Sequence, residues 1–417
     1  MRKPKVSRRT RRPIAQATGG PFSLLIKPAS GECNLRCDYC FYLEKCDLFP
    51  SRGRRRMSEE TLTAMLESYF STPQPNYTFA WQGGEPTLMG LDFFKLVVEL
   101  QQKLAPRGAR ITNGIQTNGT LITDEFAEFL ADYRFLVGIS IDGPPHIHDR
   151  YRTSAFGGAT HAQVLRGLDR LKAAGAEVNA LTVVNGLNVD KAAVVYSYLR
   201  DELELLWHQY IPLVEFDGHS RRLPFAITGE QWGRFLNELF ESWYPDDTRR
   251  VSVRLFDSIL QALAHGTYAQ CTMAGTCSSY VVVEHTGSIY PCDFFVEPHL
   301  ELGSVLERGI AAARRTPCAT QFAAQKSRWP GECARCPYLM LCSGDCPRMR
   351  AEQGPSVLCD GWKAFYERRL DAFRSLAREV PGDNGGVDRL MRETAPDAPC
   401  FCGSGRRFGN CHGGRAT

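Results

Sequence analysis

Short apolar runs alternate with longer amphipathic stretches along the first half of the chain, from Pro21 to about Val214. The short runs predict buried strands at residues 23–27, 78–82, 110–117, 135–141, 178–184 and 207–213. The longer stretches predict amphipathic helices at residues 58–69, 91–104, 123–131, 162–173 and 189–203. Strands that alternate with helices imply an α/β fold with a parallel sheet and right-handed crossovers. Periodicity alone does not separate an open sheet from a partial barrel.

The pattern changes after Pro224. Thr228 and Gln231 have the spacing of a capping box, which predicts a helix over residues 229–244. From Cys271 onward the chain has little periodicity and many cysteines, which indicates a fold organised around metal, with one further amphipathic helix at residues 365–379. The predicted organisation is a disordered basic arm at 1–20, an α/β domain at 21–224, helices and a Cys-rich domain at 225–380, a linker at 381–395 and a small separate unit at 396–417.

Cysteine is abundant, with 16 among 417 residues. A chain of this length buries a large core without disulfides, so clustered cysteines favour metal ligands over bridges. No segment approaches the roughly 20 apolar residues of a membrane helix. Ser7-Arg8-Arg9 resembles a twin-arginine signal, but residues 13–20 are not apolar, so export is not expected. These features predict a cytoplasmic protein with no membrane partner.

The net charge of +4 hides an uneven distribution. Seven of the 50 basic residues lie in the first twelve positions: Arg2, Lys3, Lys5, Arg8, Arg9, Arg11 and Arg12. Without them 43 basic residues (50 minus 7) stand against 46 acidic ones, so the rest of the chain is slightly acidic. The arm is therefore interpreted as a solvated tail, and nucleic acid is not expected as a partner.

The first cysteine group is Cys33, Cys37 and Cys40, in a loop directly after the first predicted strand. Iron–sulfur clusters are normally held by four Cys thiolates, so three ligands leave one iron open to a substrate or cofactor. The C-x3-C-x2-C spacing, with an aromatic residue before the last Cys, is the signature of radical S-adenosylmethionine (SAM) enzymes. The alternative is a zinc knuckle, for which Cys46 is the only nearby fourth ligand.

Polar residues follow the later strands where a parallel sheet binds its ligands, at the carboxyl ends. Gly83-Gly84-Glu85 ends the second predicted strand, and its glycines allow backbone carbonyls to approach an ammonium group. Ser140 and Arg152 lie at or just beyond the fourth, and their side chains suit the methionyl carboxylate of SAM. The alternative for Arg152 is a surface ion pair.

Eight further cysteines form two more groups, enough for two sites of four thiolates each. They are Cys271, Cys277, Cys292, Cys333, Cys336, Cys342, Cys346 and Cys359. This is the pattern of a SPASM domain, which carries two auxiliary clusters in radical SAM enzymes that modify peptides. Two zinc sites are the alternative for the same residues.

Five runs resemble the anaerobic sulfatase-maturating enzymes. They are residues 24–30 (LLIKPAS), 37–42 (CDYCFY), 82–88 (QGGEPTL), 116–121 (QTNGTL) and 290–294 (YPCDF), the last being the most specific. The resemblance covers roughly residues 21–375. It implies a partial (β/α)6 TIM-like barrel of radical SAM type followed by a SPASM domain.

The resemblance also implies roles for individual residues. The residues expected to contact SAM are Tyr39, Gly83, Gly84, Glu85, Ser140, Arg152 and Val214. The first auxiliary cluster takes Cys271, Cys277, Cys292 and Cys346, and the second takes Cys333, Cys336, Cys342 and Cys359. Asp293 matches the proton acceptor of the family. The alternative for Asp293 is a hydrogen bond that only supports the cluster loop.

The activity implied is oxidation of a Cys or Ser residue of a sulfatase to Cα-formylglycine through a 5′-deoxyadenosyl radical. The implied cofactors are SAM and three 4Fe–4S clusters, and the implied partners are a sulfatase polypeptide or peptide and an electron donor such as flavodoxin or ferredoxin. The rival within enzymes is a SPASM maturase of another peptide or protein. A non-catalytic metalloprotein is the rival from a different class, but it would not need an open cluster.

The C-terminal unit carries Cys400, Cys402, Cys411 and His412, which suffice for a closed tetrahedral zinc site. The run at residues 402–408 (CGSGRRF) resembles a SEC-C motif. The unit has too few residues for a core and is expected to fold only with zinc, as a docking module for a protein partner; the alternative is a tail with no partner. Cys46 and Cys318 remain as free thiols.

Overall fold

The computed structural model describes residues 20–49, 53–216, 221–351 and 354–380, together with Pro396, Asp397 and Arg407. The predicted basic arm, apart from Gly20, lies outside the described residues. So do Cys400, Cys402, Cys411 and His412 of the C-terminal unit.

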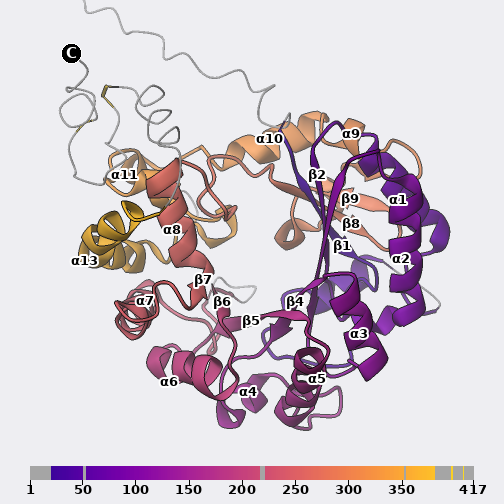
Figure 1. Cartoon of the computed structure of the whole chain (residues 1–417). Helices are drawn as coiled ribbons and strands as arrows, with labels where there is room; N and C mark the ends of the chain where they lie inside the picture. The colour runs from indigo at the N-terminus through magenta and orange to yellow at the C-terminus, as the bar shows by residue number, and fades with distance from the viewer. Residues whose placement is uncertain are drawn as a thin grey trace, which may run out of the picture.

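A single sheet of ten strands organises the described chain, in the order β10-β9-β8-β1-β2-β3-β4-β5-β6-β7. Its strands are β1 (Ser23–Lys27), β2 (Asn76–Trp81), β3 (Arg110–Thr117), β4 (Leu136–Ser140), β5 (Glu177–Val184), β6 (Trp207–Pro212), β7 (Ser252–Val253), β8 (Tyr280–Glu284), β9 (Ser288–Tyr290) and β10 (Gly303–Ser304). From β8 through β1 to β7 all neighbours are parallel, and β9 and β10 continue antiparallel at one edge. The sheet curves but does not close, so the prediction of a partial barrel is confirmed (Figure 1).

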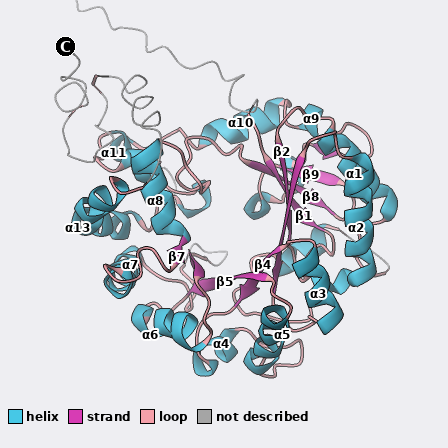
Figure 2. Ribbon diagram, viewed as in Figure 1, coloured by secondary structure: helices cyan, strands magenta, loops and turns pink. Residues whose placement is uncertain are grey.

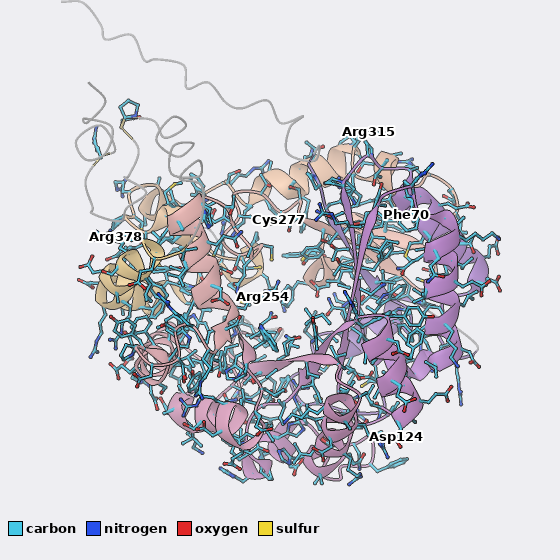
Figure 3. The ribbon with its side chains drawn as sticks, viewed as in Figure 1. Phe70, Asp124, Arg254, Cys277, Arg315 and Arg378 are labelled. Atoms are coloured by element: carbon cyan, nitrogen blue, oxygen red, sulfur yellow. The ribbon has the colours of Figure 1, made fainter. Side chains whose placement is uncertain are left out.

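Helices cover the outer face of the curved sheet (Figure 2). Those of the first half are α1 (Glu59–Phe70), α2 (Leu91–Leu104), α3 (Asp124–Asp132), α4 (Pro145–Tyr151), α5 (His161–Ala173) and α6 (Ala192–Ser197). Ser58 and Thr123 cap α1 and α3 by accepting hydrogen bonds from backbone N–H groups of the first turn. Side chains fill the space between sheet and helices, among them Phe70 at the end of α1 (Figure 3).

Two predicted helices differ from the structure in form. The stretch predicted as one helix at 189–203 is α6 followed by a π-helical segment, Tyr198–Glu202. The last helix, α13 (Cys359–Ala377), begins at Cys359 rather than at residue 365. Its first turn carries Asp360 and Gly361, which do not extend the apolar stripe that periodicity detects.

The helix α7 (Gly229–Trp243) begins with the predicted capping box of Thr228 and Gln231. It packs closely on α13, where a Cβ on Gly361 would lie 2.0 Å from the Gly229 carbonyl oxygen. The remaining helices of this half are α8 (Arg254–His265), α9 (Ile310–Ala313), α10 (Pro317–Gln325), α11 (Gly331–Ala334) and α12 (Leu339–Cys342).

The region from Cys271 onward contains a strand pair that its sequence did not indicate. β8 lies beside β1 in parallel register, from Ser23 opposite Tyr280 to Lys27 opposite Glu284. The Cys-rich region therefore shares a sheet with the α/β domain, and the loop after β9 lies near the first cysteine group. Among the described residues, no helix is both long and apolar enough to cross a membrane.

Candidate active site and auxiliary cysteine cavities

A cavity of about 190 Å³ lies at the carboxyl ends of the parallel strands. The thiols of Cys33, Cys37 and Cys40 line it. All seven residues predicted to contact SAM line it too: Tyr39, Gly83, Gly84, Glu85, Ser140, Arg152 and Val214. The fold thus brings together residues that are up to 181 positions apart (33 to 214).

The chain itself holds the first cysteine loop in place. The backbone N–H of Arg36 donates to the Thr153 carbonyl (2.8 Å), and that of Asp38 donates to the Tyr151 carbonyl (3.0 Å). On the other side, the Asn118 amide donates to the Asn34 side chain (2.9 Å) and lies 3.8 Å from the Cys33 sulfur. The loop is therefore fixed by hydrogen bonds that need no metal.

Gly84 is required by close packing, because a Cβ there would lie 1.9 Å from the Glu32 carbonyl oxygen. Glu85 follows it, and its buried carboxylate accepts hydrogen bonds from the Asn118 N–H (2.7 Å), the Thr117 hydroxyl (2.7 Å) and Thr87. Burial raises the pKa of Glu85, and these hydrogen bonds oppose the shift. The Glu85 side chain is thus occupied in joining the ends of β2 and β3, which leaves backbone groups of this turn for a ligand.

Asp293 does not line this cavity but lies beside Lys27, which does, and the residue is 9 % exposed. One carboxylate oxygen accepts from the Tyr280 hydroxyl (3.0 Å) and from the Phe294 N–H (3.2 Å), and the other lies 3.8 Å from the Lys27 ammonium nitrogen. Lys27 lines the cavity, and Phe294 lines both this cavity and the next one. Burial lowers the pKa of Lys27, while the Asp293 and Glu284 carboxylates oppose the shift.

The other eight cysteines fall into two cavities. One, of about 140 Å³, is lined by Cys271, Cys277, Cys292 and Cys346, and the second, of about 30 Å³, by Cys333, Cys336, Cys342 and Cys359. These are the two interleaved sets that the family resemblance implied. Trp362, on α13, lines both cavities.

The thiols of Cys33, Cys37 and Cys346 are neutral at neutral pH until metal binds. Burial raises the pKa of Cys33 to about 12, of Cys37 to about 11 and of Cys346 to about 12, and neighbouring cysteines add to each shift. Binding of iron as thiolates therefore releases protons and is favoured by higher pH. Within the described ranges, no three His, Cys, Asp or Glu side chains converge closely enough for a single metal ion. Thiols arranged around cavities fit the larger iron–sulfur clusters better than the single zinc ions left open above.

Family models match three parts of the chain: the radical SAM superfamily at residues 28–199, the iron–sulfur cluster-binding SPASM domain at 271–337 and the SEC-C motif at 398–414. A serine-type anaerobic sulfatase-maturating enzyme of Bacteroides thetaiotaomicron is 35% identical over 383 residues, covering 86% of this chain and 92% of the relative. A cysteine-type enzyme of Clostridium perfringens is 36% identical over 371 residues, covering 86% and 99%. This chain belongs to the anaerobic sulfatase-maturating enzymes. It is a radical SAM oxidoreductase.

Solved structures agree with membership in the sulfatase-maturating family. Native anSMEcpe with bound AdoMet and the Cp18Cys peptide superposes with a TM-score of 0.80 at 34% identity, covering 87% of this chain and 100% of that one. Streptococcus suis SuiB bound to S-adenosylmethionine, at 16% identity and a TM-score of 0.58, shares the fold alone.

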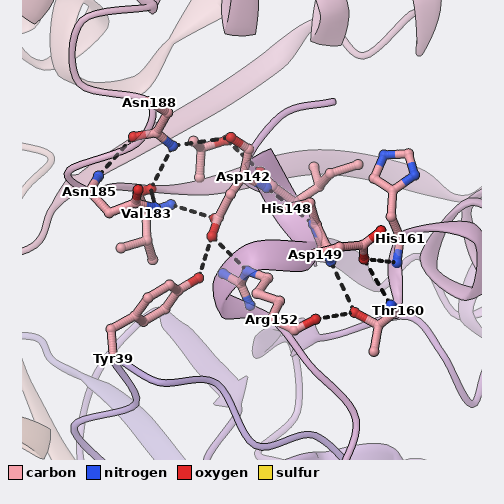
Figure 4. Close-up of polar contacts among 12 residues, drawn as sticks. Tyr39, Asp142, His148, Asp149, Arg152, Thr160, His161, Val183, Asn185 and Asn188 are labelled. Carbon is pink, nitrogen blue, oxygen red and sulfur yellow. Dashed lines mark hydrogen bonds and ion pairs between the residues drawn. The ribbon is translucent and has the colours of Figure 1, made fainter. Parts of the chain in front are cut away.

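Sequence reasoning missed three residues of this sulfatase-maturating enzyme's site. Tyr280 and Lys27 hold Asp293, and Asp142 holds Arg152 and Tyr39 (Figure 4). Lys27 and Asp142 were available as signals, since each is a charged residue at the carboxyl end of an apolar strand. Tyr280 carried no signal, because β8 was not expected.

Proposed function

We propose that this protein oxidises a Cys or Ser residue of a sulfatase to Cα-formylglycine, with SAM bound in the 190 Å³ cavity. The observation that carries the proposal is the position of Asp293. Its carboxylate is paired with Lys27, which lines the cavity with three thiols and polar strand ends, and with Tyr280, which lines the second cavity with its four thiols. This position supports a role for Asp293 as the proton acceptor in the oxidation of a side chain.

The residues of the first cavity fit SAM. Cys33, Cys37 and Cys40 would hold a cluster with one open iron, and the Arg152 guanidinium would bind the methionyl carboxylate. The turn at Gly83 and Gly84 offers backbone carbonyls to the methionyl ammonium group. When bound, SAM and the reduced cluster supply a 5′-deoxyadenosyl radical, which removes a hydrogen atom from Cβ of the target residue.

Asp293 would accept the proton of the target thiol or hydroxyl, which requires hydrogen-bond reach. Tyr280 donates to one oxygen of this carboxylate, and Lys27 lies beside the other, so the acceptor has a fixed direction. The electron balance is complete: the target would lose one hydrogen atom from Cβ, one proton to Asp293 and one electron. A cluster held by Cys271, Cys277, Cys292 and Cys346 would accept that electron. A Ser target becomes the aldehyde directly, and a Cys target becomes a thioaldehyde that water converts to the aldehyde with loss of hydrogen sulfide.

The same proposal includes a one-electron donor such as flavodoxin or ferredoxin in the cytoplasm, because the reaction starts from a reduced cluster. Zinc in the C-terminal unit, held by Cys400, Cys402, Cys411 and His412, and a protein partner for that unit are further parts of the proposal. The SEC-C match at residues 398–414 supports them.

The test uses the reconstituted full chain with SAM, a reductant and a peptide that carries the sulfatase motif Cys/Ser-x-Pro/Ala-x-Arg. Mass spectrometry should show conversion of the target residue to the aldehyde, which a hydrazide reagent then labels. Matched peptides with Cys, Ser or Ala at the target position separate the two substrate types from background. Cleavage of SAM without oxidation of either peptide, but with modification of a different precursor peptide, would favour the rival SPASM maturase.

A further inference from the structure

Asp142 is a buried carboxylate that lies outside the sequence motifs and has no role in the proposed mechanism. It follows β4 by two residues and is 1 % exposed. Figure 4 shows its side chain at the centre of a network that joins the first cysteine loop, the Arg152 side chain and the loop after β5. A charged group buried to this extent needs partners, so its partners indicate what it is for.

One side of Asp142 is fixed to the sheet. Its Oδ1 accepts from the Val183 N–H on β5 (2.9 Å), and its backbone carbonyl accepts from the Asn188 amide (3.1 Å). Asn188 in turn accepts from the Asn185 N–H (2.8 Å). These contacts set the direction of the second carboxylate oxygen, Oδ2.

That second oxygen meets two groups of the SAM cavity. Arg152 Nε forms an ion pair with it at 3.0 Å, and the Tyr39 hydroxyl donates a short hydrogen bond to it. The Arg152 guanidinium also lies over the Tyr39 ring, with its carbon 5.5 Å from the ring centre. Burial by itself lowers the pKa of the Arg152 guanidinium, but Asp142, Tyr39 and Cys37 together outweigh burial and raise that pKa.

The Arg152 backbone is held as well. Its carbonyl accepts from the Thr160 hydroxyl (2.5 Å), and that hydroxyl lies 3.2 Å from the His148 ring nitrogen. Arg152 Nε is paired with Asp142, and the two terminal nitrogens of the guanidinium make no hydrogen bond within the described part of the chain. Arg152 lines the cavity, so these nitrogens are the ones available to a ligand.

We propose that Asp142 is a positioning residue for SAM. It holds Nε of Arg152 so that the two terminal nitrogens of the guanidinium face the methionyl carboxylate. Through its hydrogen bond with Tyr39 it also connects Arg152 to the first cysteine loop. Asp142 thereby fixes the relative positions of two parts of the SAM site that follow different strands, the cysteine loop after β1 and Arg152 after β4. Asp142 acts through Arg152 and Tyr39 and does not itself line the cavity. This inference rests on the proposed function, since it assumes that SAM occupies this cavity.

The test is Asp142→Asn in the reconstituted full chain. Asn keeps the shape and can still accept from the Val183 N–H, but it removes the charge that holds Arg152. The dissociation constant of SAM, measured by equilibrium dialysis, should rise about tenfold or more. The change that SAM causes in the electron paramagnetic resonance spectrum of the reduced first cluster should need correspondingly more SAM. Iron content and thermal melting, measured alongside, should match the wild type.

Asp149→Asn is the matched control. Asp149 is a carboxylate of the same network (Figure 4), and among the described residues it accepts only from the backbone N–H groups of Thr160 and His161, both at 2.8 Å. Its replacement by Asn should change SAM affinity by less than about twofold. An equal loss in both variants would overturn the proposal, because it would show a general effect of disturbing this network.

A double-mutant cycle keeps the test decisive if Asp142→Asn folds poorly, because Arg152→Gln removes the charge that would be left unpaired. If Asp142 acts chiefly through Arg152 and to a smaller extent through Tyr39, adding Asp142→Asn to Arg152→Gln should weaken SAM binding by clearly less than Asp142→Asn weakens it in the wild type. A full additional loss in the double variant would overturn the proposal. Failure of the wild type to bind SAM would instead overturn the proposed function.

Discussion

The first cysteine loop and the auxiliary cysteine region build thiol sites in opposite ways. In the loop, three thiols come from residues 33–40, and backbone hydrogen bonds to Tyr151 and Thr153 fix the chain between them. In the auxiliary region, eight thiols come from residues 271–359, and the helices α11 and α12 beside them have only four residues each. We therefore expect the auxiliary region to depend more on its clusters for folding than the barrel does.

The two regions also differ in what surrounds the thiols. Polar groups such as Gln82, Gln116 and Arg152 line the first cavity. Aromatic side chains such as Trp232, Phe322 and Trp362 line the first auxiliary cavity. A polar wall with an open iron suits a polar cofactor, and an aromatic wall excludes water around a cluster that only carries electrons.

The largest expected effect is on SAM cleavage. Replacing Cys33, Cys37 and Cys40 together by Ala should abolish formation of 5′-deoxyadenosine and remove about a third of the bound iron, because one of three ligand sets is gone. Thermal melting and protease resistance of the barrel should stay close to wild type, because hydrogen bonds hold the loop. Survival of SAM cleavage in this variant would refute the radical mechanism.

The matched variant replaces Cys333, Cys336, Cys342 and Cys359 by Ala. It also removes one ligand set, but here limited proteolysis should cut within residues 271–380. Equal protease resistance of the two variants would show that the proposed contrast between the regions is wrong.

The next largest effect is expected from Asp293, which lies between the first cysteine loop and the auxiliary cysteine region. Asp293→Asn should keep all clusters and SAM binding but slow peptide oxidation by roughly 10²- to 10⁴-fold, because it removes a proton acceptor without changing shape. Formation of 5′-deoxyadenosine should continue, uncoupled from product. The measurement is the ratio of 5′-deoxyadenosine to oxidised peptide. Unchanged oxidation would leave Asp293 with only the supporting role considered above.

The contrast also explains what could be predicted from sequence. The barrel strands were predictable because each one alternates with an amphipathic helix, and β3 and α2 have the predicted limits. The cysteine spacings similarly identified the cluster chemistry, because ligand spacing is a local property of the chain.

The missed features depend on contacts between distant segments. β8 has five residues and pairs with β1, more than 250 positions earlier (280 minus 23 is 257), so no local pattern announces it. Tyr280 and Asp142 become important only through the partners that this folding supplies. The sequence marks Asp142 as a charge at the carboxyl end of an apolar strand, but only its partners show that it holds Arg152 and Tyr39.

A smaller effect is expected from Tyr280, which belongs to both regions because β8 joins the barrel sheet. Its hydroxyl lies 3.0 Å from the Cys292 sulfur and donates to Asp293 at 3.0 Å. Tyr280→Phe should slow peptide oxidation by roughly two- to tenfold, the loss typical of one hydrogen bond. It should also lower the reduction potential of the first auxiliary cluster, because the one hydroxyl proton, shared between the Asp293 carboxylate and the Cys292 sulfur, stabilises the added charge of the reduced state.

Redox titration of the isolated enzyme measures that potential, and Tyr290→Phe provides the control. Tyr290 lies on β9 and its hydroxyl faces Glu301 at 3.5 Å, away from the thiols. Its replacement should leave both potential and rate unchanged. A Tyr280→Phe enzyme with the wild-type potential and rate would show that Asp293 is oriented by Lys27 and the Phe294 N–H alone.

The smallest effect on catalysis is expected from the C-terminal unit, which tests where the catalytic regions end. Cys400, Cys402, Cys411 and His412 would occupy every position of a tetrahedral zinc site, so none remains for a substrate. Deleting the residues beyond Pro396 should therefore remove one zinc per chain, leave the iron content unchanged and keep the rate on a free peptide within about twofold. The rate on a full-length sulfatase should fall if the unit recruits protein partners, and Cys400→Ser with Cys402→Ser should reproduce that fall. Loss of peptide oxidation on truncation, with all three clusters still present, would place the unit in the active site and overturn the division of the chain into a catalytic body and a docking tail.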